Sequence, residues 1–257
     1  MKKIIILISF VIAILGSIEV RGQVLINSYA FASETNSMIT PDLVSLWDSS
    51  SIDPTATTEG DDINTWSDAY GSNDATQTLT SRPKLHIASD GDRQVRFDGG
   101  DDWLNVGTPS NLNFVGNTDA FSCVIKTGEV HGAGANGYWI SKASATGSTR
   151  NYGFYDSGSG AEISFVIGGA NTNIGTAPSA DDLIIFTITS GGAYTIRING
   201  TESTGTTAGS NSSDVDINIG GRSNGGYTLE GDIQMIGMYN DVLTAGEISA
   251  IETQYLE

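Results

Sequence analysis

Short runs in which apolar and polar residues alternate recur along most of the chain. Alternation at a period of two gives a β-strand one face that can be buried and one that stays wet. A dozen such runs, separated by Gly, Asn, Asp and Ser, predict an all-β fold, a two-sheet antiparallel jelly-roll sandwich. The runs span residues 43–48, 62–68, 83–88, 93–99, 120–128, 137–143, 151–157, 161–169, 182–191, 193–200, 215–221 and 229–240.

One pair of runs predicts its own connection. In "TSGGAYTIRING" the Gly191-Gly192 pair separates two alternating segments, and glycine adopts the positive φ angles that a tight hairpin turn requires. The sequence therefore predicts a β-hairpin here.

The pattern changes to a helical period only near the C-terminus. Thr244 followed by Glu247 has the spacing of a capping box, in which each side chain accepts from the other residue's backbone amide. Ile248, Ile251 and Tyr255 then fall on one helical face. A short C-terminal helix packed on the sandwich is expected.

The N-terminal stretch "MKKIIILISFVIAILGSIEVRGQ" has the layout of a secretory signal peptide, with two lysines before an apolar run. The run from Ile4 to Ile18 is shorter than the roughly 20 residues that span a bilayer. We expect residues 1–22 to be the signal, residues 23–40 a leader or docking segment, and residues 41–257 the domain. The expected location is secreted or extracellular, with no membrane contact after cleavage.

The charge of the chain excludes some partners. The net charge is −18, and the signal carries three basic residues and one acidic residue, so its removal leaves −20. Such a chain has no basic surface for phosphates, which argues against nucleic acid or anionic lipid as a partner. Cys123 is the single cysteine, which excludes an internal disulfide and favours a small buried hydrophobe.

Four segments resemble the laminin-G-like branch of the concanavalin A-like lectin/glucanase superfamily. They are "VRFDGGDDWLNVG", "YWISKASATGSTRNYGFYDSGSGAEISFVIGG", "YTIRINGTESTG" and "LEGDIQMIGMYNDVLTAGEI", in the family's order, over roughly Leu43 to Leu256. The resemblance implies a jelly roll that binds glycans or proteins through loops at one rim and that in some members holds calcium. Near the N-terminus, "LINSYAFA" resembles the opening residues of some phage virion subunits.

The acidic stretch "FDGGDDWLNVG" is interpreted as a hairpin turn. Asp98 can accept backbone amides in an Asx-turn while a following glycine takes a left-handed conformation. We expect the carboxylates to serve as separate backbone partners, because calcium takes about six to eight oxygen ligands and only three carboxylates cluster here. No cofactor is required, and Asp101 and Asp102 are the candidate ligands of a structural calcium.

The sequence argues against catalysis. Glucanases on this sandwich place two or three carboxylates on one strand face, as in E-x-D-x-x-E, and retaining hydrolysis needs two carboxyls about 5 Å apart. Only Glu230 and Asp232 come near this pattern. His86, expected to be a half-buried strand residue, and His131 have no recognisable catalytic partner. A degenerate glycoside hydrolase is the alternative.

Binding is the remaining function. The four tryptophans are expected mainly in the core. Loops that combine aromatic and polar residues supply the candidate ligand-binding residues Tyr152, Tyr155, Asp156, Arg222, Asn224 and Tyr227. We therefore predict an exported non-catalytic module for adhesion or recognition, with a surface glycan or a protein as its partner. The alternative is a structural subunit of a phage virion or surface appendage, which would contact neighbouring subunits.

Overall fold

The computed structural model describes residues 37–131, 137–144, 150–157, 162–176, 179–209, 214–222 and 226–256. The chain divides into two units at Ile39 and Thr40, and the sandwich belongs to the second unit, residues 40–257. The predicted signal segment, almost all of the predicted leader and Asn224 lie outside the described residues.

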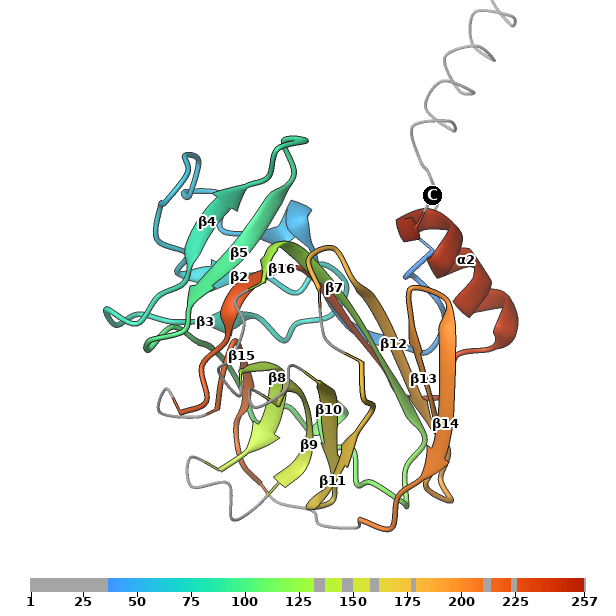
Figure 1. Ribbon diagram of the computed structural model, residues 1–257. Coiled ribbons are helices and arrows are strands. Elements are labelled where there is room, and N and C mark those ends of the chain that lie inside the picture. The colour runs from blue at the N-terminus through green and yellow to red at the C-terminus, as the bar shows by residue number, and fades with distance from the viewer. Residues whose placement is uncertain are drawn as a thin grey trace, which may run out of the picture. The chain divides into compact units, whose positions relative to one another are not determined.

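The first sheet of the sandwich is antiparallel and has eight strands, in the order β14-β13-β12-β7-β16-β5-β4, with β1 also paired to β16. Figure 1 shows β14 at one outer edge and β4 and β5 toward the opposite side. The strands are β1 (Leu43–Trp47), β4 (Lys84–Ile87), β5 (Arg93–Asp98), β7 (Phe121–His131), β12 (Leu183–Ile188), β13 (Ala193–Ile198), β14 (Thr201–Thr206) and β16 (Glu230–Tyr239).

The second sheet also has eight strands, in the order β11-β10-β9-β8-β15-β6-β3-β2. They are β2 (Thr65–Trp66), β3 (Ala75–Thr76), β6 (Leu104–Gly107), β8 (Tyr138–Ala143), β9 (Arg150–Asp156), β10 (Ile163–Ile167), β11 (Ala170–Asn173) and β15 (Ile217–Ile219). Two short 3-10 helices, Ser49–Ser51 and Ser110–Leu112, lie in connections. The predicted two-sheet sandwich is confirmed.

Apolar side chains from both sheets meet in one core. Trp47, Ile125 and Phe186 come from the first sheet, and Phe154 and Phe165 come from the second; all are essentially inaccessible to solvent. In β10 and β12 the core residues alternate along the strand, as the period of two predicts. Trp66 and Trp139 are also buried, whereas Trp103 is only half-buried.

The strands that the pattern did not predict are short or polar. β3 has two residues, β11 reads "ANTN" and β14 reads "TESTGT", so none shows apolar alternation. The run at 62–68 contributes only Thr65–Trp66. These segments form strands because a neighbouring strand offers backbone partners, and local composition carries no signal for that.

The predicted hairpin joins β12 to β13 in antiparallel register. One detail of the prediction was wrong, since Gly192 has φ of +78° but Gly191 does not have a positive φ. The Gly192 amide donates to the Thr189 carbonyl at 2.9 Å, so a single left-handed glycine closes this turn.

The C-terminal helix α2 (Ala245–Leu256) begins with the predicted capping box. The Thr244 amide donates to Glu247 Oε2 at 2.7 Å, and the Glu247 amide donates to Thr244 Oγ1 at 3.3 Å. Ile251 is fully buried, and Glu252 receives a bidentate hydrogen bond from Arg197 of β13. This contact fixes the helix to the first sheet, beside β12 and β13 (Figure 1).

Cys123 is buried in β7, as predicted, and its burial raises the pKa of the thiol far above the ordinary value. Within the described part of the chain, no helix is both long enough and apolar enough to cross a bilayer.

Candidate functional site

Several strand ends meet at one rim of the sandwich. β7 ends at His131 and β8 begins at Tyr138, while β15 ends at Ile219 and β16 begins at Glu230. Antiparallel pairing sets the start of β8 beside the ends of β9 and β15, and the end of β7 beside the start of β16. The rim therefore gathers residues that are far apart in sequence.

A tyrosine pair forms the base of the site. Tyr138 and Tyr155 are cross-strand neighbours in β8 and β9, and their ring centroids lie 4.7 Å apart in a stacked arrangement. Both are buried in a small apolar cluster with Val166. A side chain at Gly153 would place its Cβ 2.6 Å from the Tyr138 ring, so glycine at this position leaves room for the pair.

Arg222 lies on this pair. Its guanidinium carbon is 4.7 Å from the Tyr138 ring centroid, and its Nη2 donates to the Tyr138 hydroxyl at 2.7 Å. The residue is 5% exposed, and its buried Nε has no hydrogen-bond partner in the part of the chain that the structure describes. Cation–π attraction to aromatic faces is a favourable environment for a desolvated guanidinium.

Tyr227 also packs against the guanidinium. The Arg222 guanidinium carbon is 3.9 Å from the Tyr227 ring centroid, and the Tyr227 ring meets Tyr138 edge-on at 6.4 Å. Tyr227 is 50% exposed and has φ of +58°. A non-glycine residue in the left-handed region costs roughly 1–3 kcal/mol, and such residues cluster at functional sites. We call Tyr138, Tyr155, Arg222 and Tyr227 the tyrosine–arginine cluster.

Three of the predicted binding residues, Tyr155, Arg222 and Tyr227, thus come together. Tyr138 was missed, because strict alternation in "GYWISK" cannot show the register shift between Tyr138 and Ile140 that turns Tyr138 away from the main core. Its place at the end of a polar loop was the available signal.

The other predicted binding residues are not part of the tyrosine–arginine cluster as the structure describes it. Tyr152 is fully buried in the main core and its hydroxyl donates to the Leu112 carbonyl at 3.1 Å, so it does not reach the surface. Asp156 is at the rim but 2% exposed, and its amide donates to the Gly137 carbonyl. Asn224 lies outside the described residues.

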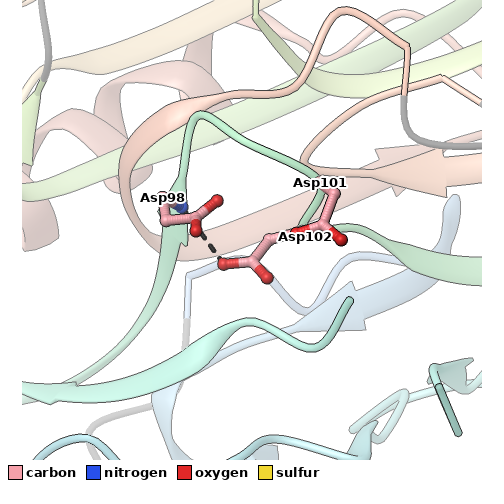
Figure 2. A group of neighbouring side chains, drawn as sticks. All are labelled: Asp98, Asp101 and Asp102. Carbon is pink, nitrogen blue, oxygen red and sulfur yellow. Dashed lines mark hydrogen bonds between the residues drawn. The ribbon is translucent and has the colours of Figure 1, made fainter. Parts of the chain in front are cut away.

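The acidic turn is the second feature of this rim. Asp98 Oδ1 accepts from the Gly100 amide at 2.7 Å, and Gly99 has φ of +75°, which are the contacts that the turn interpretation predicts. The expectation that the carboxylates stand apart was wrong. Asp98, Asp101 and Asp102 bring one carboxylate oxygen each to within 4.8 Å of one another (Figure 2).

Asp102 is the buried member of this group. Its Oδ2 accepts from the Asp98 amide at 3.1 Å (Figure 2). Burial, followed by the charges of Asp98 and Asp101, raises the pKa of Asp102 to about 7. Three carboxylates supply fewer oxygens than calcium takes, so backbone carbonyls and water would have to complete a site.

The acidic turn contacts the segment that carries Tyr227. The Thr228 hydroxyl donates to the Gly99 carbonyl at 2.8 Å, and the Gly99 amide donates to the Leu229 carbonyl at 2.9 Å. The tyrosine–arginine cluster and the acidic turn therefore share one rim.

The two carboxylates considered for hydrolysis differ in environment. Asp232 is buried and receives a bidentate hydrogen bond from Arg96, at 2.8 and 3.0 Å. Glu230 is exposed. Asp232 is therefore held in a structural ion pair, and the hydrogen bonds that Arg96 donates to Asp232 raise the pKa of Arg96.

His86 is half-buried in β4, as predicted, but it is more than a filler. Its Nδ1 lies 3.1 Å from Glu59, and its Nε2 lies 3.3 Å from Glu129 and 3.7 Å from Asp232. These contacts connect β4, β7 and β16 across the outer surface of the first sheet.

No protein-family model matches the sequence, and neither does any curated protein. Solved structures do match. A Trypanosoma rangeli sialidase in complex with sialic acid has a TM-score of 0.55 at 14% identity, over 84% of this chain and 33% of the sialidase chain. The binding domain of Paraclostridial Mosquitocidal Protein 1 has a TM-score of 0.59 at 11% identity, over 84% of this chain and 53% of that chain.

The chain thus spans about a third of the sialidase chain and about half of the toxin binding domain. At these identities the matches concern the fold. This chain shares their β-sandwich fold, built here from two antiparallel sheets.

Proposed function

We propose that the protein is an exported, non-catalytic module of laminin-G-like type that recognises surface glycans through the tyrosine–arginine cluster. The observation that carries the proposal is the half-exposed Tyr227 ring, fixed in a strained backbone conformation over Arg222. An exposed aromatic face can stack on the apolar face of a sugar ring, and its polar edge stays wet. Because the ring is already fixed, little side-chain entropy is lost on binding.

The surrounding groups support recognition of a hydroxyl-rich ligand. Main-chain carbonyls and the acidic turn lie beside the segment that carries Tyr227. Ligand sites of this kind combine an aromatic platform with a few polar groups that fix orientation. Two structures with the same fold support a recognition role by analogy, since one is a sialidase bound to sialic acid and the other a toxin binding domain.

The test is a glycan array probed with the whole chain and with a Tyr227→Asn variant. Asparagine tolerates the left-handed conformation, so this change removes the ring without adding backbone strain. Tyr70→Asn is the matched control, because Tyr70 is 45% exposed in a turn outside the rim segments. We expect the array signal to fall at least about tenfold in Tyr227→Asn, which corresponds to about 1.4 kcal/mol, and to persist in Tyr70→Asn.

An array without signal, or equal signals from both variants, would contradict the proposal. The degenerate-hydrolase alternative has its own readout, since reducing sugar released from β-glucans and abolished by Glu230→Gln would identify an enzyme.

A further inference from the structure

A pocket of about 290 Å³ with a mixed polar and apolar lining lies at the β13–β14 edge of the sandwich. Asp182, Ile198, Asn199, Thr201 and Ser203 contribute to its wall. None of these residues belongs to the tyrosine–arginine cluster or to the acidic turn.

The pocket exists because the first sheet extends beyond its cover. In β14, Thr201 pairs with Ile198 and Ser203 pairs with Ile196, and both isoleucines belong to the core. Cross-strand partners share a face, so Thr201 and Ser203 face the interior side of the sheet. Both are nevertheless exposed, which shows that the second sheet does not cover them. An open, hydroxyl-lined recess results.

The floor of the recess is held rigidly. Asp182 is 4% exposed, its Oδ1 accepts from Asn199 Nδ2 at 2.7 Å and its Oδ2 accepts from the Ser179 amide at 2.6 Å. Asn199 Oδ1 in turn accepts from the Leu183 amide at 2.9 Å. A carboxylate has about four acceptor positions, so Asp182 retains capacity for hydroxyl donors. The pocket is built before any ligand arrives.

The pocket opens near the end of the sandwich that carries the candidate site. The Thr127 amide of β7 donates to the Asp182 carbonyl at 2.9 Å, and β7 continues to His131 at the rim. An extended ligand on the rim can therefore approach the pocket along the same end of the fold.

We infer that this pocket is a second subsite, which takes one neutral sugar unit, and the inference rests on the proposed function. The volume is at the lower limit of the range for small-molecule sites and suits a single small ring. Hydroxyl, amide and carboxylate groups match sugar hydroxyls, and Ile198 supplies an apolar wall. The Asp182 charge, on a chain of net charge −18, disfavours acidic sugars such as sialic acid.

The test uses saturation-transfer NMR on the whole chain with methyl hexosides and N-acetylneuraminic acid as probes. Ser203→Leu fills the recess from β14. Thr204→Leu is the matched control, because Thr204 is the next residue on the same exposed strand and points to the opposite face. We expect a neutral hexoside to bind, its affinity to fall at least about tenfold in Ser203→Leu, and Thr204→Leu to bind as the wild type does.

Equal affinity in Ser203→Leu and wild type, tighter binding of N-acetylneuraminic acid than of every hexoside, or no binding of any probe would overturn the inference. Tyr227→Asn separates the two proposals. If hexoside binding survives in that variant while the array signal is unchanged, the pocket stands and the tyrosine–arginine site fails. If the array signal falls and Ser203→Leu has no effect, the pocket fails and the first site stands.

Discussion

At the scale of single residues, burial of Asp102 beside two other carboxyl groups links its protonation to the stability of the fold. The group is 5% exposed, and its pKa is raised to about 7. Between the ordinary aspartate pKa near 4 and pH 7, the folded chain therefore holds a proton that the unfolded chain has released. The contribution of this group to the free energy of unfolding therefore falls as pH rises from about 4 to about 7.

Asp102→Asn tests this linkage by urea denaturation between pH 4 and pH 8. The wild type should lose stability from this group across that range, by up to about 4 kcal/mol, because deprotonation places a third charge in the cluster. The variant has no such charge, and its amide oxygen can still accept from the Asp98 amide. We expect Asp102→Asn to equal the wild type near pH 4 and to exceed its stability at pH 8.

Asp90→Asn is the control, since Asp90 is exposed and lies outside the acidic turn. A wild-type minus Asp102→Asn difference that does not change with pH would contradict the linkage. The assignment of Asp101 and Asp102 as calcium ligands stays a prediction. The same denaturation series with calcium tests this assignment, because bound calcium would raise the denaturation midpoint of the wild type at pH 8 and leave the midpoint of Asp102→Asn unchanged.

At the scale of elements, local sequence signals were reliable where the signal and its partner are close in the chain. The capping box of α2 and the β12–β13 hairpin were both predicted, because each closes within a few residues. β14 and β11 were not, because their polar residues pair only with a strand already in place.

Thr244→Ala tests the contribution of the cap. The variant loses the hydrogen bond to the Glu247 amide, and a lost N-cap costs about 1 kcal/mol. For a domain of this size we expect the midpoint of thermal unfolding to fall by about 2–4 °C.

Thr253→Ala serves as the comparison within the same helix. Its hydroxyl donates to the Ser249 carbonyl inside α2, where alanine is a better helix former. Thr244→Ala should therefore lower the midpoint of thermal unfolding. Thr253→Ala should raise it or leave it unchanged. If Thr253→Ala lowered the midpoint as much as Thr244→Ala does, the cap would contribute no more to stability than another hydroxyl of the same helix.

At the scale of the whole molecule, the excess of acidic groups works against the compact fold. The chain carries −18 at pH 7, and like charges across one domain repel. The alternative of a virion or appendage subunit belongs to this scale as well, and the mass of the protein in solution decides it.

Thermal unfolding at pH 7 in 10 and 300 mM NaCl tests the repulsion. The Debye length falls from about 30 Å to under 10 Å over this range, so salt screens charges across the domain. We expect the midpoint to rise by about 2–4 °C for each kcal/mol of repulsion relieved. Near pH 4.2, the isoelectric point, the same salt step should have little effect. If salt raised the midpoint equally at both pH values, a cause other than net charge would explain the rise.

The candidate site was predictable only in its parts. Tyr155, Arg222 and Tyr227 stood out as aromatic or polar loop residues, but the sequence does not show that Tyr138 connects them. Tyr152 has the same composition around it and points into the core instead. A register shift of one residue decides which face a tyrosine occupies.

The amino-acid sequence by itself determined the period of the strands, the hairpin and the helix cap, because each follows from contacts between residues close in the chain. It predicted the two-layer class from the number of alternating runs. The tertiary structure alone decided the burial of Asp102 beside Asp98 and Asp101, the packing of Arg222 against two tyrosines and the recess beside β14. These depend on register shifts, on buried charge and on where one sheet ends above the other. Such properties arise only when segments distant in the chain pack together.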